Sequence, residues 1–477
     1  MRLSGFASGL DIDNMVKELM QARRKTYDNL VKDRTKVEWQ REDYRSMNAK
    51  IIDFRNNKLA SFNLSNSINA KSTELSGATS SIMMNATNST ASGTLNVEVT
   101  QVATSENHVY TFGTGDLGSV GFLEDPANPS NVKITINGSS ISLAKTASLD
   151  ELAKAINSNS SSLKATALYN ADTGQFSIAA TKTGEGMLEL TDPIFDTPDS
   201  SRVGKNAIVN INGINYEQSS NRFNVNGFDF TVKESTNPGE TVSLTAVQDT
   251  SKIIDTIKSF VTEYNSLISS INSEVSEANY RSYKPLSSAE KKEMTEDEIE
   301  KWEEKARSGT LRNDSTLSQL VSELRITATS LISGVVDGNG DKISIGISTG
   351  SYTEKGKLIL DEEKLRDALD ANSDAVIDLF TNSSTGVFKQ MSASSMTALK
   401  GLSDKAGTSL TSTDLNGTFK EDSVIGRELR EMKKREDALM DRLNRMETQY
   451  YKQFTAMEKA INRFNSQAGM LSSFMSS

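Results

Sequence analysis

Cysteine is absent from the 477 residues of the chain, and histidine occurs only once, at His108. Without cysteine there are no disulfide bonds, no thiolate metal ligands and no thiol nucleophile. A single histidine also rules out metal sites that are built on two or three imidazoles. A serine-histidine-aspartate triad needs only one histidine, but no nucleophile-elbow motif accompanies His108. The missing residue types thus exclude much of the common metal and catalytic chemistry.

Proline is scarce, and none of the six prolines lies in the first 125 or the last 190 positions. Because proline breaks helix interiors, both ends of the chain are free to form long helices. No segment approaches the roughly 18 apolar residues of a membrane span. Asp11 and Asp13 interrupt any apolar core of a cleavable signal peptide near the start. We therefore expect the protein to stay inside the cell or to leave by a route that does not read such a signal.

Positive charge and apolar residues are both in deficit, with a formal net charge of −10 and 36% apolar residues. A nucleic-acid binder would show a basic patch or stripe, so we expect no nucleic-acid partner. An acidic chain is also poorly suited to an anionic membrane surface, and we expect no membrane partner. Because globular chains are usually ~45–50% apolar, much of this chain should be elongated, solvated or buried only on assembly.

The C-terminal segment 428–475 carries an apolar stripe whose members alternate at spacings of three and four. One four-four step interrupts the alternation, which is typical of a coiled coil with a single stutter. As one helix this segment would reach roughly 70 Å at 1.5 Å per residue, and its stripe needs a partner. The stripe consists of Met432, Glu436, Leu439, Leu443, Met446, Tyr450, Phe454, Met457, Ile461, Phe464, Ala468, Leu471 and Met475.

The N-terminal segment 11–62 has a helical pattern and offers such a partner. Its stripe is half polar, so it specifies a partner poorly in isolation. The two stripes are compatible with an antiparallel pair within one chain, with packing between subunits, or with both. One set of stripe positions is Leu30, Val37, Tyr44 and Ile51, and the companion set is Met20, Tyr27, Arg34, Arg41 and Asn48.

The middle of the chain predicts β-structure between residues 90 and 250. Residues 93–103 alternate with period two, as expected of a half-buried strand. Asn137-Gly138, Asn212-Gly213 and Asn226-Gly227 each separate two alternating runs, and both residue types tolerate the positive φ of a type I′ hairpin turn. Residues 148–158 predict a short helix with a capping box. Residues 131–180 therefore form a ββαββ module, and 241–247 adds a strand.

Helical pattern returns at 250–280, and an acidic helix is predicted at 295–306. Ile343, Ile345 and Ile347 alternate as a strand, and residues 358–360 predict another short strand before a helix over 361–370. Residues 381–425 are rich in serine, threonine and glycine and lead into the last helix.

Three patterns that could carry chemistry are better explained as structure. GTGDLG at 113–118 matches a dinucleotide-binding fingerprint, but the glycine and proline that follow do not predict the helix that this site needs. DGNGD at 337–341 lacks the glycine and glutamate spacing of a calcium loop and predicts a turn. A carboxylate pair could hydrolyse glycosides, but nothing singles out a pair among 63 acids. We therefore expect no enzyme activity, no catalytic or metal site and no cofactor.

The N-terminal segments SGFASGLDIDNMVKELMQARRKTYDNL (4–30) and EWQREDYRSMNAKIIDFRNNKL (38–59) closely resemble the start of the flagellar filament-capping family, also called hook-associated protein 2. Segments 204–214, 283–314, 356–369 and 450–471 resemble the C-terminal region of the same family. The 283–314 stretch looks like the Gram-positive branch, and the ββαββ module is similar to inserts of flagellin and other filament proteins. Together these segments cover about half of the chain.

This resemblance implies an α+β multidomain fold. It has terminal coiled-coil helices (1–50 and 426–477), a mixed helical and β domain (51–75 and 250–425), and an inserted β-rich region of two lobes (76–104 with 203–249, and 105–202). The resemblance also implies a homo-oligomeric ring at the filament tip, under which exported flagellin folds and inserts. The implied partners are further copies, flagellin, the hook-filament junction protein and a flagellar export chaperone. The implied location is extracellular, reached through the flagellar type III apparatus.

Filament docking and subunit packing are expected to use apolar residues at both ends of the chain. The polar positions Arg34 and Arg41 would keep these contacts modest, and apolar substitution there should alter cap exchange and filament growth. An adhesin acting through the β lobes and a flagellin or junction protein are the competing interpretations, although SGLDIDNMV at 8–16 favours the cap. The expected contact residues are Leu10, Ile12, Val16, Leu19, Phe454, Met457, Ile461 and Phe464.

Overall fold

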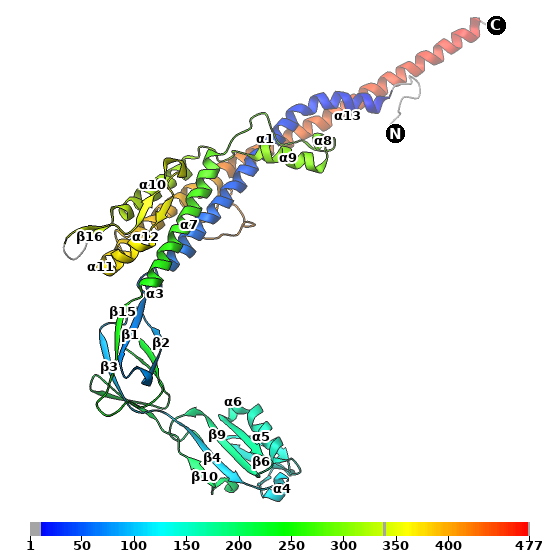
Figure 1. Ribbon diagram of the computed structural model, residues 1–477. Helices are drawn as coiled ribbons and strands as arrows, with labels where there is room; N and C mark the ends of the chain where they lie inside the picture. Colours follow the sequence, from blue (N-terminus) through cyan, green and yellow to red (C-terminus); the bar gives the residue numbers. More distant parts are fainter. Residues whose placement is uncertain (1–10, 337–339, 476–477) are drawn as a thin grey trace. The chain divides into compact units, whose positions relative to one another are not determined.

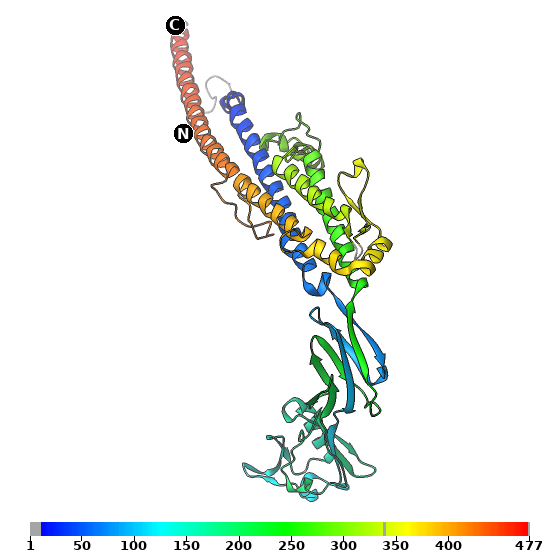
Figure 2. The ribbon, with the colours of Figure 1, turned by 90° about the vertical axis from the view of Figure 1, so that its left-hand side faces the viewer.

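The computed structural model describes residues 11–336 and 340–475, and the chain divides into two compact units. Unit 1 combines Met1–Ile68 with Thr250–Ser477, and unit 2 is Asn69–Asp249. Figures 1 and 2 show that unit 1 is mainly helical and that unit 2 is mainly β-structure. The α+β multidomain architecture expected from the sequence is confirmed, while the finer division into four domains stays a prediction.

Unit 1 is built from both ends of the chain. Its helices are α1 (Ile12–Ile52), the π-helical η1 (Asp53–Leu59), α2 (Ala60–Phe62), α3 (Ser65–Ile68), α7 (Thr250–Ser276), α8 (Ser288–Lys291), α9 (Glu296–Arg307), α10 (Ser315–Ser333), η4 (Tyr352–Glu354), α11 (Glu362–Thr381), α12 (Val387–Ala406) and α13 (Val424–Met475). Its short strands are β16 (Val335–Val336), β17 (Lys342–Ile343), β18 (Ile347–Thr349) and β19 (Leu358–Leu360).

The N-terminal helix begins where the sequence predicts. The side chain of Asp11 caps α1 by accepting a hydrogen bond of 2.9 Å from the Asn14 backbone N–H. Helical structure then runs through α1, η1 and α2 to Phe62, and a π-helical segment is the main irregularity in it. The predicted helix over 11–62 is therefore confirmed.

The C-terminal helix α13 is a single helix of 52 residues. It lies beside α1 in both ribbon views (Figures 1 and 2), and the two helices are among the most extensively contacting elements of the molecule. The sequence prediction of one long helix over 428–475 is confirmed, and the helix starts slightly earlier, at Val424.

Aromatic side chains from helices far apart in the sequence form a core of unit 1. The Phe260 ring of α7 lies 5.3 Å from that of Phe388 in α12 and 5.8 Å from that of Phe380 in α11, measured between centroids. Phe62 at the end of the N-terminal helix approaches the same ring at 6.3 Å. Aromatic contacts of this kind add to the free energy of area burial, so they fasten the N-terminal helix to the bundle.

One helix was not predicted, and two local predictions need correction. The stretch 381–425 contains α12, whose Phe388, Met391 and Leu399 are buried at helical spacing despite the surrounding serines. Ile343, Ile345 and Ile347 do not share one strand, because Gly346 with a φ of 72° separates β17 from β18. The GTGDLG loop leads into the one-turn helix α4 (Leu117–Val120), which Asp116 caps. Residues 337–339 of the predicted DGNGD turn lie outside the described residues.

Unit 2 consists of small antiparallel sheets. The largest has the order β1-β15-β3-β11-β12, and others have the orders β10-β4-β9-β8, β13-β14-β2 and β5-β6-β7. The strands are β1 (Lys71–Gly77), β2 (Ile82–Thr87), β3 (Thr94–Gln101), β4 (Ser105–Thr111), β5 (Glu124–Asp125), β6 (Asn128–Ile136), β7 (Ser139–Ala144), β8 (Ala165–Asn170), β9 (Gln175–Thr183), β10 (Ser200–Arg202), β11 (Ala207–Ile211), β12 (Ile214–Gln218), β13 (Arg222–Val225), β14 (Phe228–Val232) and β15 (Val242–Gln248). The helical segments are η2 (Thr79–Ser81), α4, α5 (Leu149–Ser158), α6 (Ser160–Leu163) and η3 (Pro193–Phe195).

Asn-Gly turns close the hairpins as predicted. Asn137 and Gly138 adopt φ values of 51° and 72° between β6 and β7, and the equivalent turns join β11 to β12 and β13 to β14. Ser148 and Glu151 complete the predicted capping box of α5. One hydrophobic core gathers around this helix and a second gathers around β3 and β11, which confirms an inserted β-rich region of two lobes.

Candidate functional site

The first part of the candidate site is the seam between α1 and α13. Asp13 accepts a hydrogen bond from the Tyr451 hydroxyl at 2.9 Å, and Tyr27 donates one to Glu436 at 3.3 Å, so the two helices run antiparallel. Ile12, Val16, Met20 and Leu443 are buried in the seam, with Tyr27, Met446, Tyr450, Tyr451 and Phe454 packed against them. The chain thus forms the intramolecular pair that the sequence allowed.

The expected contact residues of the N-terminal end divide between the inside and the outside of this pair. Ile12 and Val16 are buried against α13. Leu19 is 42% exposed and is not among the residues of the seam cluster. Leu10 lies outside the described residues. Of these residues, Leu19 alone keeps an exposed apolar side chain in the described part of the chain.

The expected contact residues of the C-terminal end differ in their solvent exposure along α13. Phe454 packs against the seam cluster, and Ile461 is half-buried. Met457 is 37% exposed and Phe464 is 69% exposed. Met470 and Leu471 continue the exposed stripe beyond them. A series of exposed large apolar side chains along one helix is typical of an interaction surface.

An ion pair with a buried carboxylate occupies the polar part of the seam. The Arg34 Nε lies 2.8 Å from the Glu436 carboxylate, and Glu436 is only 7% exposed. Burial, and then the negative charge of Glu436, raise the pKa of the neighbouring Tyr27 hydroxyl. A single polar pair among apolar seam positions fixes the register of two helices at some cost in stability.

The other two polar stripe positions hold the segment between α12 and α13. Arg41 donates to the Ala406 carbonyl at 3.0 Å, and its guanidinium lies 4.0 Å from the centre of the Phe419 ring. The Arg45 guanidinium lies 3.6 Å from the centre of the same ring. The Asn48 amide donates to the Ser409 carbonyl at 2.8 Å. The polar residues that made the stripe look weak therefore have specific partners within the chain.

Asp314 joins three helices at one buried carboxylate. It caps α10 by accepting from the Leu317 N–H at 2.9 Å, and it also accepts from the Tyr44 hydroxyl of α1 at 2.7 Å and pairs with Lys405 of α12. Burial alone would raise the pKa of this carboxyl, but the hydrogen bonds from Lys405 and Tyr44 hold it below its usual range. Sequence patterns missed this group because its partners are remote along the chain.

Acidic side chains crowd the contact between α1 and α7. Asp43 pairs with Arg307 at 2.6 Å, and Glu277 accepts from the Gly309 N–H at 2.6 Å. Burial, followed by the charges of Asp43 and Glu277, raises the pKa of Glu274 in α7, with partial compensation from Lys50 and Arg307. The charged form of Glu274 is therefore unfavourable in the folded state.

We expect the Glu274→Gln variant to be more stable than the wild type at pH 7. A raised carboxyl pKa destabilises the fold above the folded-state pKa and has no effect below the unfolded-state value. The gain in melting temperature should therefore shrink as the pH falls toward 4, as measured by circular dichroism across pH. Glu300→Gln on the exposed face of α9 is the control and should change little. A gain that stays constant with pH would contradict this explanation.

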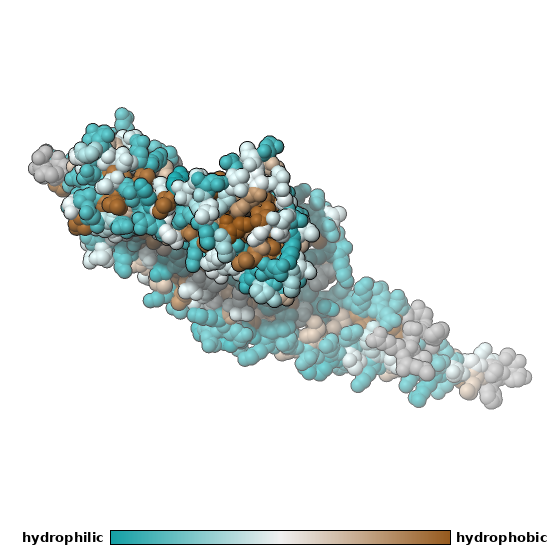
Figure 3. All heavy atoms as spheres, turned by 90° about the horizontal axis from the view of Figure 1, so that it is seen from below, coloured by the Kyte–Doolittle hydropathy of each residue, from teal (hydrophilic) through white to brown (hydrophobic). Residues whose placement is uncertain are grey.

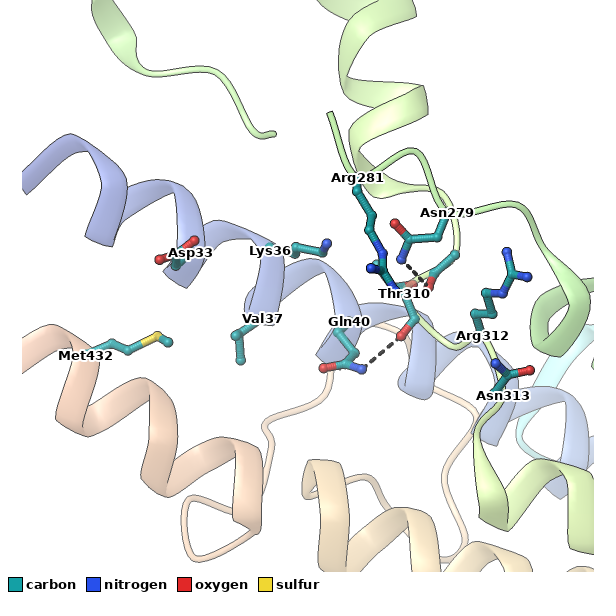
Figure 4. Close-up of a pocket in the computed structure, with 11 residues that line it drawn as sticks. Asp33, Lys36, Val37, Gln40, Asn279, Arg281, Thr310, Arg312, Asn313 and Met432 are labelled. Atoms are coloured by element: carbon teal, nitrogen blue, oxygen red, sulfur yellow. Dashed lines mark hydrogen bonds between the residues drawn. The ribbon is translucent and has the colours of Figure 1, made fainter. Parts of the chain in front are cut away.

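A groove lies on unit 1 between α1, α13 and the segments that follow α7 and precede α10. Its volume is about 800 Å³. Figure 4 shows basic and amide side chains around it, with Gln40 donating to the Thr310 carbonyl at 2.8 Å and Asn279 bridging to Gly309. Its charged lining residues are Asp33, Lys36, Arg281 and Arg312, so positive charge prevails.

The surface of unit 2 is mainly hydrophilic. In the space-filling view of Figure 3 apolar residues gather in patches between hydrophilic ones. Exposed large apolar side chains of this unit include Leu123, Leu168, Val203 and Ile214. Among the described residues, no three histidine, aspartate or glutamate side chains are grouped as metal ligands would be. Within the same part of the chain, no helix has the length and hydropathy of a membrane span.

Matches to known families cover most of the chain. Residues 8–106 match the family described as "Flagellar hook-associated protein 2 N-terminus", and residues 204–466 match "Flagellar hook-associated protein 2 C-terminus". Residues 131–182, which include the ββαββ module, match the "Flagellin hook IN motif".

Individual relatives carry the same description. The chain is 28% identical to flagellar hook-associated protein 2 of Halalkalibacterium halodurans, with 99% of each chain covered, which is consistent with a Gram-positive type. It is 25% identical to the Thermotoga maritima protein of that name, over 71% of this chain and 54% of the relative. The crystal structure of the Escherichia coli flagellar cap protein FliD, domains D1-D2-D3, covers 81% of this chain and 99% of its own with a TM-score of 0.48 and 21% identity. Since the C-terminal match alone spans more than half of the chain, this protein belongs to the flagellar hook-associated protein 2 family.

Proposed function

We propose that this protein is the structural cap of the bacterial flagellar filament, where it guides the folding and insertion of exported flagellin. The observation that carries the proposal is the outer part of α13, whose apolar stripe continues beyond the buried seam cluster and leaves Phe464 and Leu471 exposed. Exposed apolar side chains on a helix of this length need a partner, and a helical filament end offers one. Membership of the hook-associated protein 2 family supports the same role.

The proposed working form is a ring of several copies at the filament tip. Leu10, Ile12, Val16 and Leu19 at the front and Phe454, Met457, Ile461 and Phe464 at the back are proposed as filament or subunit contacts. The further proposed partners are flagellin, the hook-filament junction protein and a flagellar export chaperone. The proposed route to the outside of the cell is the flagellar type III apparatus. The role is structural, with no catalysis and no cofactor.

The function is tested in a strain that lacks the gene and is complemented with the full-length chain. We expect the deletion strain to release flagellin monomers into the medium and to carry hooks without filaments, and we expect the complemented strain to recover both. Immunoblots of the medium and negative-stain electron microscopy measure these outcomes. Normal filaments in the deletion strain would overturn the proposal.

A tip adhesin that binds host surfaces is the second candidate, favoured by the exposed apolar residues of unit 2 such as Leu168 and Val203. The lobe that contains the ββαββ module can be deleted as one segment, because the Thr104 N–H donates to the Lys205 carbonyl at 3.0 Å and the two ends of the segment are adjacent there. If the lobe is only an adhesin, deletion of 105–203 will abolish adhesion to host cells and spare filament assembly. Loss of filaments in this variant would instead assign the lobe to the cap.

A further inference from the structure

The groove beside α1 is a basic surface whose cations are not neutralised within the chain. Lys36, Arg281 and Arg312 line it, and Asp33 is the one acid on its wall among the described residues. In the described part of the chain none of these three cations forms an ion pair with a carboxylate, whereas neighbouring Lys32 and Arg307 each have one. Figure 4 shows Arg281 and Lys36 on facing walls of the groove.

The walls of this groove are held in place before any partner arrives. Gln40 bonds to the Thr310 carbonyl at 2.8 Å, which ties α1 to the segment before α10. The Asn279 side-chain amide donates to the Gly309 carbonyl at 3.4 Å, and the Gly309 N–H donates to the Glu277 carboxylate at 2.6 Å. A preformed site loses less conformational freedom on binding than a flexible one, so fixed cations of this kind suit a docking surface.

An acidic segment that is complementary in charge to this groove lies elsewhere on unit 1. The segment 293–300 reads EMTEDEIE and has no basic residue. Its acids Glu293, Glu296, Asp297 and Glu300 are exposed, and none of them has an ion-pair partner among the described residues. Glu298 is occupied by the capping box with Thr295, which holds the first turn of α9 rigid. This acidic turn is therefore an ordered knob that carries several free carboxylates.

We infer that the acidic first turn of α9 in one copy of this chain docks into the basic groove of the next copy. An acidic knob and a basic groove on each copy make a heterologous, head-to-tail contact, which closes into a ring when the rotation allows. A contact of groove against groove would place like charges opposite each other and is disfavoured. The inference rests on the proposed function, because it assigns a contact within the proposed ring.

Charge reversal tests this contact with the full-length chain. The groove variant is Arg281→Glu with Arg312→Glu, and the knob variant is Glu296→Lys with Asp297→Lys. Each is expected to weaken self-association roughly 100-fold or more, because like charges would then face each other across the interface. A chain that carries all four changes should associate again, since its knob and groove are once more opposite in sign. Sedimentation velocity at low salt measures association, and added salt should weaken it in the wild type.

A control variant changes the net charge by the same amount as the groove variant but at positions outside the groove. Lys389→Glu with Lys400→Glu reverses two exposed cations of α12, and this variant should associate like the wild type. All changed residues are on the surface, and unchanged melting curves will show that each variant is folded.

Three outcomes overturn the inference. If the groove and knob variants form rings as well as the wild type does, this contact is wrong, but the proposed ring is not affected. Groove variants that still form rings but lose flagellin binding would assign the groove to flagellin. A wild-type chain that stays monomeric at low salt, while filaments are still capped in cells, would overturn the ring as well as the contact.

Discussion

Replacing Asp314 by alanine is expected to lower the free energy of unfolding of unit 1 by about 3–5 kcal/mol, the range for breaking a buried charge pair. Asp314 is only 7% exposed, and its carboxylate is shared by Tyr44 of α1, Lys405 of α12 and the first turn of α10. The alanine variant leaves the Lys405 ammonium and the Tyr44 hydroxyl without this acceptor and removes the helix cap. Chemical denaturation followed by circular dichroism measures the loss.

Acid should reduce the difference between this variant and the wild type. The lowered pKa of Asp314 means that its contribution is present above the ordinary value of 3.8 and is lost as the pH falls through the folded-state pKa. The control is Asp361→Ala, which removes the cap of α11 where the carboxylate is exposed to solvent. If both aspartate variants lost the same stability, the three-helix contact of Asp314 would not be a main support of the bundle.

Changing Phe464 and Leu471 to aspartate together is expected to abolish filament capping while leaving the isolated protein as stable as the wild type. Both side chains are well exposed, at 69% and 66%, so the fold of the monomer does not depend on them. Burying two such residues on docking would contribute about 3–6 kcal/mol, and this is lost when charges replace them. Docking should therefore weaken by more than roughly 100-fold.

Swimming halos in soft agar and flagellin released into the medium measure this effect in cells. The control variant, Gln453→Asp with Gln467→Asp, adds the same charge to exposed polar positions of the same helix. The control should swim normally if the apolar stripe makes the contact. Equal loss of swimming in both variants would mean that added charge on α13 is harmful wherever it lies, and the stripe would lose its assigned role.

Local features of the fold were predictable from the sequence. The Asn-Gly hairpins, the capping box at Ser148, the acidic helix α9 and the long terminal helices all occur where expected. The helix α12 was not anticipated, because its buried apolar positions are interrupted by serines that resemble loop composition. The alternation of Ile343, Ile345 and Ile347 suggested one strand, but the positive φ of Gly346 breaks it.

The candidate site was predictable only in part. The apolar stripes at both ends identified the helices that pair. Ile12, Val16 and Phe454, which were expected as filament or subunit contacts, lie in or against the seam within one chain. Arg34, Arg41 and Asn48 were interpreted as weak positions of the seam. Their partners Glu436, Phe419 and Ser409 lie hundreds of positions away, two of them in a segment without periodicity, so no local pattern could reveal them. Whether apolar substitution of Arg34 and Arg41 alters filament growth stays a prediction.

The sequence by itself determined that both ends are long helices with apolar stripes and that the middle is a series of β-hairpins. These properties follow from helical periodicity and from the few residue types that accept positive φ, and both are local. Only the tertiary structure decided which stripe residues face inward and which stay exposed. That division depends on where α13 extends beyond its contact with α1. It also depends on the ion pair between Arg34 and Glu436 within that contact. Antiparallel packing buries Ile12 and Val16 and leaves Phe464 on the surface, because the register of two helices is set by contacts that are remote in sequence.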